Sequence, residues 1–171
     1  MVATHMPFRA DEDALANLGT SQNPASPSWQ AVHVLAAGCG CSRKIAEHLV
    51  ARGTLPDLQE TVVLVGSDPE MQRRLEQAAI RVRPMTIDDA VNRYRLTTAP
   101  WLVFVGTDGS VRYAGGYSAE RNVRDGYQDA RLWNTLRMGG SAQALPAFGC
   151  ATGRELQKKV DPLGFKYRTG V

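Results

Sequence analysis

A turn that carries two cysteines, Cys39-Gly40-Cys41-Ser42, constrains this chain most, because it joins a short apolar run to a helical pattern. Residues 31–37 (AVHVLAA) are typical of a buried strand, and residues 42–52 have the spacing of an amphipathic helix that ends at Gly53. A cysteine at the start of a helix lies near backbone N–H groups without helical partners and near the positive end of the helix dipole. Such a position favours the thiolate over the thiol, so we expect chemistry at this turn.

Cysteines that form no disulfide are often only small buried apolar residues. Here, however, two of the three cysteines lie one residue apart, and Gly38 and Gly40 flank the first of them. Glycines leave a turn open to the backbone of a partner, which a buried packing site does not need. We therefore interpret Cys39 and Cys41 as reactive residues.

Length and composition predict one ordinary globular domain: 171 residues, 43% hydrophobic and 22% charged. The net charge is +3, the basic residues are scattered and only 7% of the residues are aromatic, so nucleic-acid binding is not expected. No apolar run reaches the roughly 18 residues of a membrane span. Residues 1–27 are polar and predict a flexible arm, from which a signal or anchor has been removed if the protein is exported.

The rest of the pattern alternates strands and helices. Turn and cap residues set the boundaries: Pro69 behind Ser67 or Asp68, Thr86 with Asp89 in a capping box, and an Asp108-Gly109 hairpin turn. We expect a strand at 60–66, a helix from 69, a short strand at 81–84, a helix from 86 to 94, antiparallel strands at 101–105 and 111–113, and a helix at 127–138. This order predicts an α/β fold with a mixed central sheet and helices on both faces.

This element order, with cysteines after the first strand and an X-Pro before the hairpin, resembles the thioredoxin fold, and more narrowly its redoxin branch typified by TlpA. The thioredoxin pattern Cys-Gly-Pro-Cys-Lys-x-Ile-Ala is similar to residues 39–46 (CGCSRKIA), and the resemblance covers residues 30–138. It implies that Cys39 is the attacking cysteine. Ser42 takes the place of the resolving cysteine and supports the thiolate without resolving it, and Cys41 takes the place of the proline.

The resemblance also covers Ala99-Pro100, which matches the cis-proline of the family. It implies a cis bond within reach of Cys39. Thr98, Ala99 and Pro100 would then offer backbone groups to an extended substrate.

The third cysteine, Cys150, precedes a helix predicted from the capping-box spacing of Thr152 and Glu155. It lies in an extension, residues 141–171, beyond the domain predicted for residues 28–140. Small redoxin-like proteins with a Cys-x-Cys-Ser turn are similar in carrying a Gly-Cys-Ala-Thr tail. Three roles stay open for Cys150: packing, resolving a disulfide, or completing a three-thiolate metal site.

We predict a thiol–disulfide oxidoreductase, of oxidant or isomerase type, that needs no cofactor. Cys39 attacks a disulfide of a protein substrate, and Cys41 or Cys150 resolves the mixed disulfide; an unidentified redox partner restores the protein. A Cys39–Cys41 disulfide closes a very small ring, so it would be easily reduced. The resemblance favours an exported, periplasmic location over the cytoplasm.

Binding or delivery of Cu(I) or Zn(II) through Cys39, Cys41 and Cys150 is the alternative. Redoxin-fold copper chaperones add a histidine in the hairpin region, whereas this chain has only His5, His33 and His48, which we expect to be packing or surface residues. A peroxidase is less favoured still, because Ala36 stands where peroxiredoxin-like sites have a threonine.

Overall fold

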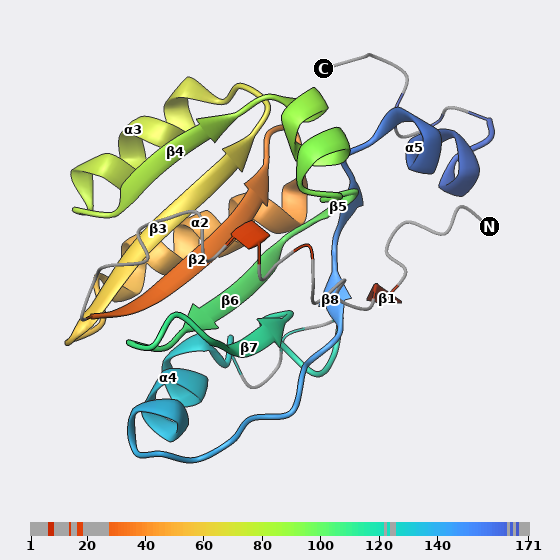
Figure 1. Cartoon of the computed structure of the whole chain (residues 1–171). Coiled ribbons are helices and arrows are strands. Elements are labelled where there is room, and N and C mark those ends of the chain that lie inside the picture. The colour runs from red at the N-terminus through yellow and green to blue at the C-terminus, as the bar shows by residue number, and fades with distance from the viewer. Residues whose placement is uncertain are drawn as a thin grey trace.

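The computed structural model of the chain describes residues 7–8, 14, 17–18, 28–121, 123, 126–163, 165 and 167 (Figure 1). Its centre is a five-stranded sheet with the order β4-β3-β2-β6-β7. The strands are β2 (Trp29–Ala36), β3 (Leu58–Val65), β4 (Arg81–Met85), β6 (Trp101–Val105) and β7 (Val111–Gly115). β2 pairs parallel with β3, and β3 with β4, whereas β6 pairs antiparallel with β2 and β7. The sequence prediction of a mixed central sheet is confirmed.

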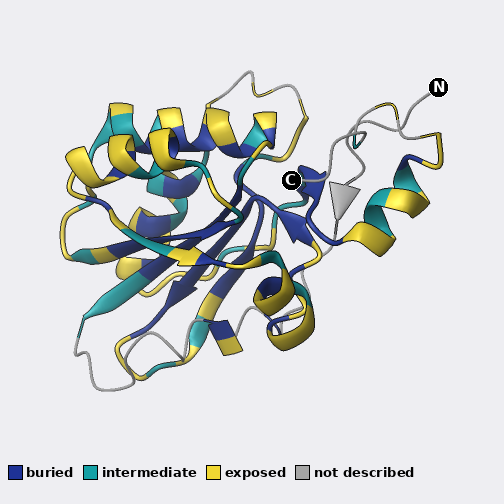
Figure 2. Ribbon diagram, turned by 90° about the horizontal axis from the view of Figure 1, so that it is seen from above, coloured by how far each residue is buried: buried dark blue, intermediate teal, exposed yellow. Residues whose placement is uncertain are grey.

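Three α-helices cover one face of the sheet: α2 (Gly40–Arg52), α3 (Pro69–Gln77) and α4 (Asp129–Arg137). Side chains on that face, such as Leu49, Phe104 and Trp133, are at most 2% exposed. The crossovers β2-α2-β3 and β3-α3-β4 run in one direction across the sheet, and their common right-handedness puts both helices on the same side. Figure 2 shows the buried strands beneath helices whose outer faces are exposed.

The other face is covered by η1 (Asp89–Arg93), by Leu18 from the N-terminal region and by the C-terminal segment. The helix expected from Thr86 to Tyr94 is present: residues 87–88 are α-helical, and they continue into the π-helical η1. Its start follows the predicted capping residues, because the Thr86 hydroxyl donates to Asp89 Oδ2 at 2.8 Å and accepts from the Asp89 N–H at 3.0 Å.

The predicted boundaries of α2 and α3 agree closely with the structure. Gly53 ends α2 with a φ of 71°, a left-handed conformation that suits glycine. Asp68 caps α3 by accepting from the Met71 N–H at 3.0 Å. Pro69 occupies the first turn, where no N–H is needed.

The N-terminal arm predicted for residues 1–27 takes part in the packing where the structure describes it. β1 (Pro7–Phe8) pairs antiparallel with β8 (Ala147–Phe148), and Leu18 is fully buried in the core. The described residues of the arm thus pack against the rest of the protein, while the remaining residues of 1–27 lie outside the described ones and the flexible arm stays a prediction there.

The C-terminal segment returns to the sheet through β9 (Cys150–Ala151) and α5 (Arg154–Val160), and β9 pairs with β5 (Thr98–Ala99). The helix after Cys150 is confirmed, but its predicted cap is not. Gly153 is the N-cap residue, and the Thr152 hydroxyl donates to the Leu96 carbonyl oxygen at 2.7 Å instead. Thr152 thus fastens the segment to the chain before β5.

A buried ionic network ties the end of α2 to β3 and α4. Arg52 pairs with Glu60 and, at 2.7 Å, with Asp129. His33 lies 3.1 Å from Glu60, and His48 lies 2.8 Å from Asp129. Burial alone would raise the pKa of Glu60, but hydrogen bonds from His33 and Arg52 lower it to about 2. Hydrogen bonds likewise lower the pKa of Asp129, so both carboxylates, Glu60 and Asp129, are charged although they are buried.

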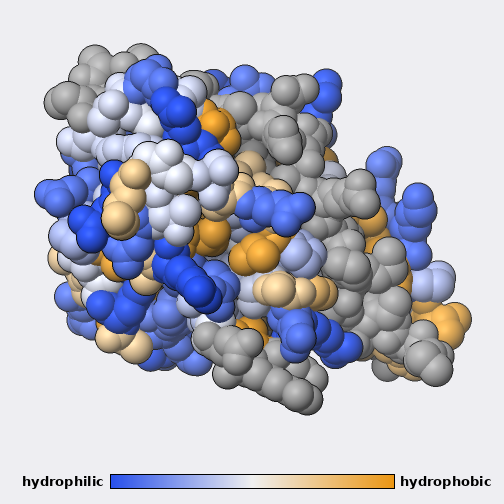
Figure 3. All heavy atoms as spheres, turned by 90° about the horizontal axis from the view of Figure 1, so that it is seen from below, coloured by the Kyte–Doolittle hydropathy of each residue, from blue (hydrophilic) through white to orange (hydrophobic). Residues whose placement is uncertain are grey.

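Among the described residues, no helix has the length and apolar character that crossing a bilayer requires. On the face seen from below, hydrophobic atoms form small separate spots among hydrophilic ones (Figure 3).

Replacing Glu60 with Gln should lower the free energy of unfolding by about 3 kcal/mol at neutral pH, because the largely buried Arg52 guanidinium loses one of its two counter-charges. A carboxyl with a lowered pKa stabilises the fold fully above its unfolded value of 4.5 and loses this effect as the pH falls towards about 2. The difference between wild type and Glu60→Gln should therefore narrow across that window in urea titrations. The exposed Glu76→Gln serves as control and should change stability by no more than about 0.5 kcal/mol. A pH-independent difference would contradict the assignment.

Candidate functional site

The cysteine turn lies where β2 ends and α2 begins, and Cys39 is the N-cap residue of α2. Ser42 is fully buried, and its hydroxyl oxygen accepts from the Ala36 N–H at 3.0 Å. Ser42 thus fixes the start of the helix to the end of the strand. Its N–H and hydroxyl also hydrogen-bond the Cys39 sulfur, in line with the predicted support of a thiolate.

The C-terminal segment brings the third cysteine to this turn. In the pairing of β5 with β9, Cys150 lies opposite Ala99, and its Sγ is 2.6 Å from the Sγ of Cys39. All three cysteines carry thiols in this structure. The structure therefore brings together Cys39 and Cys150, which are 111 residues apart in the sequence.

Hydrogen bonds lower the pKa of Cys39 far below its ordinary value. Cys150 contributes most and Cys41 next; burial opposes the change, and the groups of Ser42 add to it. Stabilisation of the anion by several donors outweighs desolvation here. Cys39 thus has strong thiolate character at this site.

The three cysteines differ in their exposure to solvent. Cys39 is 3% exposed and Cys150 5% exposed, whereas Cys41 is partly exposed in the first turn of α2. The attacking residue that the resemblance implied is thus covered, and the residue in the proline position faces solvent.

The Ala99–Pro100 peptide bond is cis, as the sequence resemblance implied. Thr98 and Ala99 are 4% and 1% exposed, and their strand, β5, is paired with β9. The backbone of Thr98 and Ala99 therefore pairs with the protein's own C-terminal segment, and a role of residues 98–100 in binding a substrate stays a prediction.

Close contacts show that this docking of the C-terminal segment depends on glycine. A Cβ on Gly149 would lie 1.8 Å from the Ala99 carbonyl oxygen, and one on Gly116 would lie 2.0 Å from the Pro146 carbonyl oxygen. No side chain fits at such distances, so Gly149 permits the approach of the segment to the cis-proline loop.

Two cavities meet the cysteines from different sides. A cavity of about 190 Å³ borders Cys39, Cys150 and Tyr167. A larger one, of about 790 Å³, opens beside Cys41. We call the larger one the Cys41 groove; it is lined by Cys41, Lys44, Ile45, His48, Pro100, Gly116, Tyr117, Ser118, Arg121, Val123, Gly126, Tyr127, Ala147 and Phe148.

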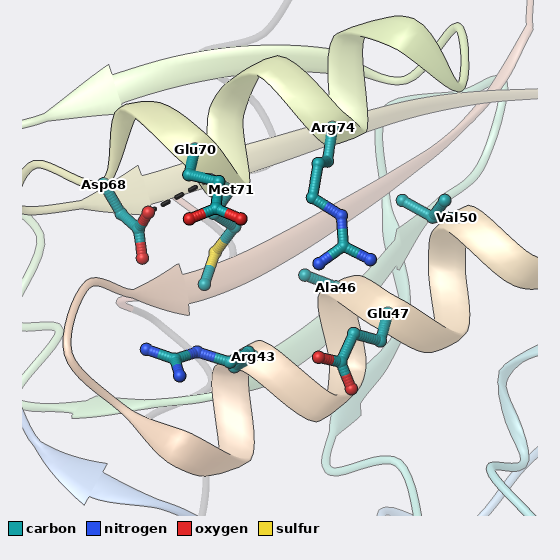
Figure 4. A pocket seen from close by; sticks show the side chains of 8 residues that line it. All are labelled: Arg43, Ala46, Glu47, Val50, Asp68, Glu70, Met71 and Arg74. Atoms are coloured by element: carbon teal, nitrogen blue, oxygen red, sulfur yellow. Dashed lines mark hydrogen bonds between the residues drawn. The ribbon is translucent and has the colours of Figure 1, made fainter.

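A third cavity, of about 270 Å³, lies between α2 and α3 (Figure 4). Arg43 and Glu47 line it from α2, and Arg74 reaches towards it from α3, while Asp68 accepts the bond that caps α3. Its lining mixes both signs of charge and includes no cysteine.

The described residues contain no group of three or more His, Cys, Asp or Glu side chains placed to hold a metal ion. His33 and His48 both belong to the buried network, with Glu60 and Asp129 as their partners, and His5 lies outside the described residues. The sequence analysis did not predict this network. Two features of the sequence indicate it: Glu60 occurs in a predicted buried strand, and Asp129 occurs at the start of a predicted core helix.

The central β-α-β unit, the antiparallel hairpin with its following helix, and the cis-proline opposite the cysteine turn define a thioredoxin-like fold of the redoxin kind. An uncharacterized conserved protein from Geobacillus kaustophilus is similar, with 11% identity, a TM-score of 0.52 and coverage of 75% of this chain and 78% of that one.

Two further solved structures show more distant similarity. The thioredoxin domain of a Bacteroides vulgatus thiol-disulfide oxidoreductase has 16% identity, a TM-score of 0.46 and coverage of 69% of this chain and 83% of that one. A secreted Mycobacterium tuberculosis disulfide oxidoreductase homologous to E. coli DsbE has 16% identity, a TM-score of 0.37 and coverage of 51% and 68%. No protein-family model matches the sequence, and no curated protein matches it significantly.

Replacing Gly149 with Ala should release β9 from β5, because the new methyl group would overlap the Ala99 carbonyl. We expect the alkylation rate of Cys39 and Cys150 to rise at least about tenfold, as an opening that costs about 1.4 kcal/mol less is ten times more populated. Hydrogen exchange of the Thr152 amide, which donates to the Thr97 carbonyl oxygen at 2.8 Å, should accelerate in parallel.

The matched control is Gly153→Ala in the same segment, where the nearest atom is a Val91 methyl carbon at 3.2 Å. It should leave both rates nearly unchanged. Equal rates in Gly149→Ala and wild type would show that the segment is not held by this contact.

Proposed function

We propose that the protein is a thiol–disulfide oxidoreductase whose redox couple is Cys39 and Cys150. The observation that carries the proposal is the 2.6 Å separation of their Sγ atoms, held by the pairing of β9 with β5. A protein disulfide or dithiol is the substrate, and no cofactor is needed.

In the proposed reaction, the electrons and protons that the protein loses are those that the substrate gains. The two thiols lose two electrons and two protons as the Cys39–Cys150 disulfide forms, and a substrate disulfide that gains them becomes two thiols. The reverse reaction oxidises a substrate dithiol. Each transfer proceeds by attack of a thiolate on a disulfide sulfur through a mixed disulfide.

Cys39 is the nucleophile within this couple. Its pKa is lowered by hydrogen bonds from Cys150 and Cys41, and it lies at the N-terminus of α2, where the helix dipole favours an anion. Ser42 adds two donors to the same sulfur, which supports its predicted role.

A disulfide that uses Cys150 differs from a Cys39–Cys41 disulfide in ring size, on which the expected ease of reduction depended. A Cys39–Cys41 ring would be very small, whereas a Cys39–Cys150 bridge spans 111 residues, so the expectation of an easily reduced small ring does not apply to this couple. An exported location belongs to the proposal, since protein disulfides persist mainly outside the cytosol.

Disulfide mapping after mild oxidation tests the couple. Wild type should yield a Cys39–Cys150 linked peptide with Cys41 still alkylatable, and Cys150→Ser should yield none and lose most of its turnover with a protein disulfide. Cys41→Ser should still form the bridge. A Cys39–Cys41 bridge as the main stable product, with full turnover in Cys150→Ser, would contradict the proposal.

The pH dependence of the Cys39 thiolate tests its activation. Ultraviolet absorbance should show one thiolate in the wild type throughout the range from neutral pH down to about pH 5, since hydrogen bonds lower the pKa of Cys39 to about 2. Cys150→Ala removes the largest contributor and leaves those of Cys41 and Ser42, so the midpoint of thiolate formation should move to higher pH, towards the ordinary value of about 8.5. Cys39→Ser should lack the signal. A wild-type thiolate that appears only near the ordinary value would refute the assignment.

A further inference from the structure

The site offers a substrate only one accessible sulfur. Cys39 and Cys150 are buried against each other, and the β5 edge next to them is paired with β9. Gly149 fits against the Ala99 carbonyl oxygen too closely for anything else to enter between them. Cys41, on the other hand, is partly exposed and lines the Cys41 groove.

One wall of this groove is a single face of α2. Cys41, Lys44, Ile45 and His48 lie three, four and seven positions apart, so they follow one stripe of the helix. The other wall is the segment after β7, with Tyr117 at the bottom of the groove, 3% exposed. The volume of about 790 Å³ is typical of a site for a ligand or a short peptide segment.

Tyr127 connects the opposite wall of the groove to α2. It lines the groove together with Cys41, and burial raises its pKa. The ring of Tyr127 packs against His48 with 4.8 Å between the ring centroids. Cys41 therefore lies on the helix wall of a groove whose opposite wall is partly aromatic.

The charges of the described lining residues indicate which kind of segment fits the groove. Lys44 and Arg121 line it, and no Asp or Glu does among the residues that the structure describes. Asp129, which pairs with His48, is fully buried, and Glu47 lines the cavity between α2 and α3. The described part of the groove thus presents the cationic side chains of Lys44 and Arg121 and aromatic surface to a partner, a combination that complements an acidic segment.

We propose that Cys41 is the entry thiol of the protein and that the Cys41 groove binds an acidic, cysteine-bearing segment of the substrate. The inference rests on the proposed Cys39–Cys150 couple and adds the route by which a substrate reaches it. It replaces the sequence-based expectation that Cys39 meets the substrate directly at the cis-proline edge.

The relay has three steps that balance. The Cys41 thiolate attacks the substrate disulfide, forming a mixed disulfide and releasing one substrate thiolate. The Cys39 thiolate, whose sulfur the Cys41 side chain contacts, attacks the Cys41 sulfur and releases the second substrate thiolate. The Cys150 thiolate then attacks the Cys39 sulfur, which forms the Cys39–Cys150 disulfide and returns Cys41 as thiolate. The two substrate thiolates take up the protons that the protein thiols lost.

Two synthetic peptides test the inference, one with Asp and Glu and one with Lys around a single cysteine, each joined to thionitrobenzoate by a disulfide. Reduced full-length protein is mixed with each peptide in a single turnover, and release of the coloured thiolate is followed. Wild type should react several-fold faster with the acidic peptide, and added salt should reduce this preference because exposed charges are screened.

Cysteine variants identify the entry thiol. Cys41→Ala should slow the reaction with the acidic peptide at least about tenfold, while Cys39→Ser should accumulate the peptide on Cys41, as mass spectrometry would show. Undiminished speed in Cys41→Ala, with the Cys39–Cys150 bridge still formed, would overturn the entry role and leave the proposed couple intact. Absence of that bridge in every reaction, the wild type included, would overturn the couple itself.

Charge variants test the substrate class. Lys44→Glu should lower the rate with the acidic peptide by about threefold and raise the rate with the basic one, since an exposed ion pair contributes about 0.2–1 kcal/mol. The matched control is Arg43→Glu, which makes the same change on the same helix turn but faces the cavity between α2 and α3. Equal effects of both variants on both peptides would overturn the acidic preference.

Discussion

The short pairing of β9 with β5 determines most of what this protein can do. Its two residue pairs place Cys150 opposite Ala99 and therefore the Cys150 sulfur beside the sulfur of Cys39. The same pairing closes the backbone edge next to the cis-proline and buries both cysteines. The pairing of β9 with β5 thus brings the Cys150 thiol to Cys39. At the same time it occupies the backbone edge of Thr98 and Ala99. Gly149 and Thr152 are the residues that make it, one by having no side chain and one by donating to Leu96.

Helix α2 carries this arrangement because both of its ends are fixed. At its start, Ser42 accepts from the Ala36 N–H, and at its end Arg52 pairs with Glu60 and Asp129. Hydrogen bonds from His48 and Arg52 overcome the effect of burial and lower the pKa of Asp129 to about 2, so that this anchor stays charged. A helix held at both ends keeps the positions of Cys39 and Cys41 relative to the sheet, which exchange between neighbouring sulfurs requires.

Local patterns predicted much of this structure, and long-range contacts account for the rest. The strand before Cys39 and the helix that Gly53 ends follow from residues close in the sequence, and the cis bond at Pro100 was implied by the family resemblance. The β9 pairing does not, because two residues carry no strand pattern of their own, and Thr152 has the spacing of a cap that it does not form. His33 and His48 were expected to be packing or surface residues, but their ion-pair partners were not predicted, because these lie 27 and 81 residues away.

The serine at position 42 gives a physical reason for a distant third thiol in the proposed couple. Thioredoxins resemble this turn but place a second cysteine there, whereas Ser42 is fully buried and its oxygen holds the Ala36 N–H. A hydroxyl cannot form a disulfide, so a resolving thiol has to come from Cys41 or from elsewhere in the fold. Cys41 lies on the groove side of α2, and the tail supplies Cys150 on the buried side. Under the proposed couple, the sulfurs that store electrons are therefore separated from the sulfur that meets solvent. Small thiols in solution would then reach the buried pair only through Cys41 or through release of β9, and the choice between these two routes decides what the protein reacts with.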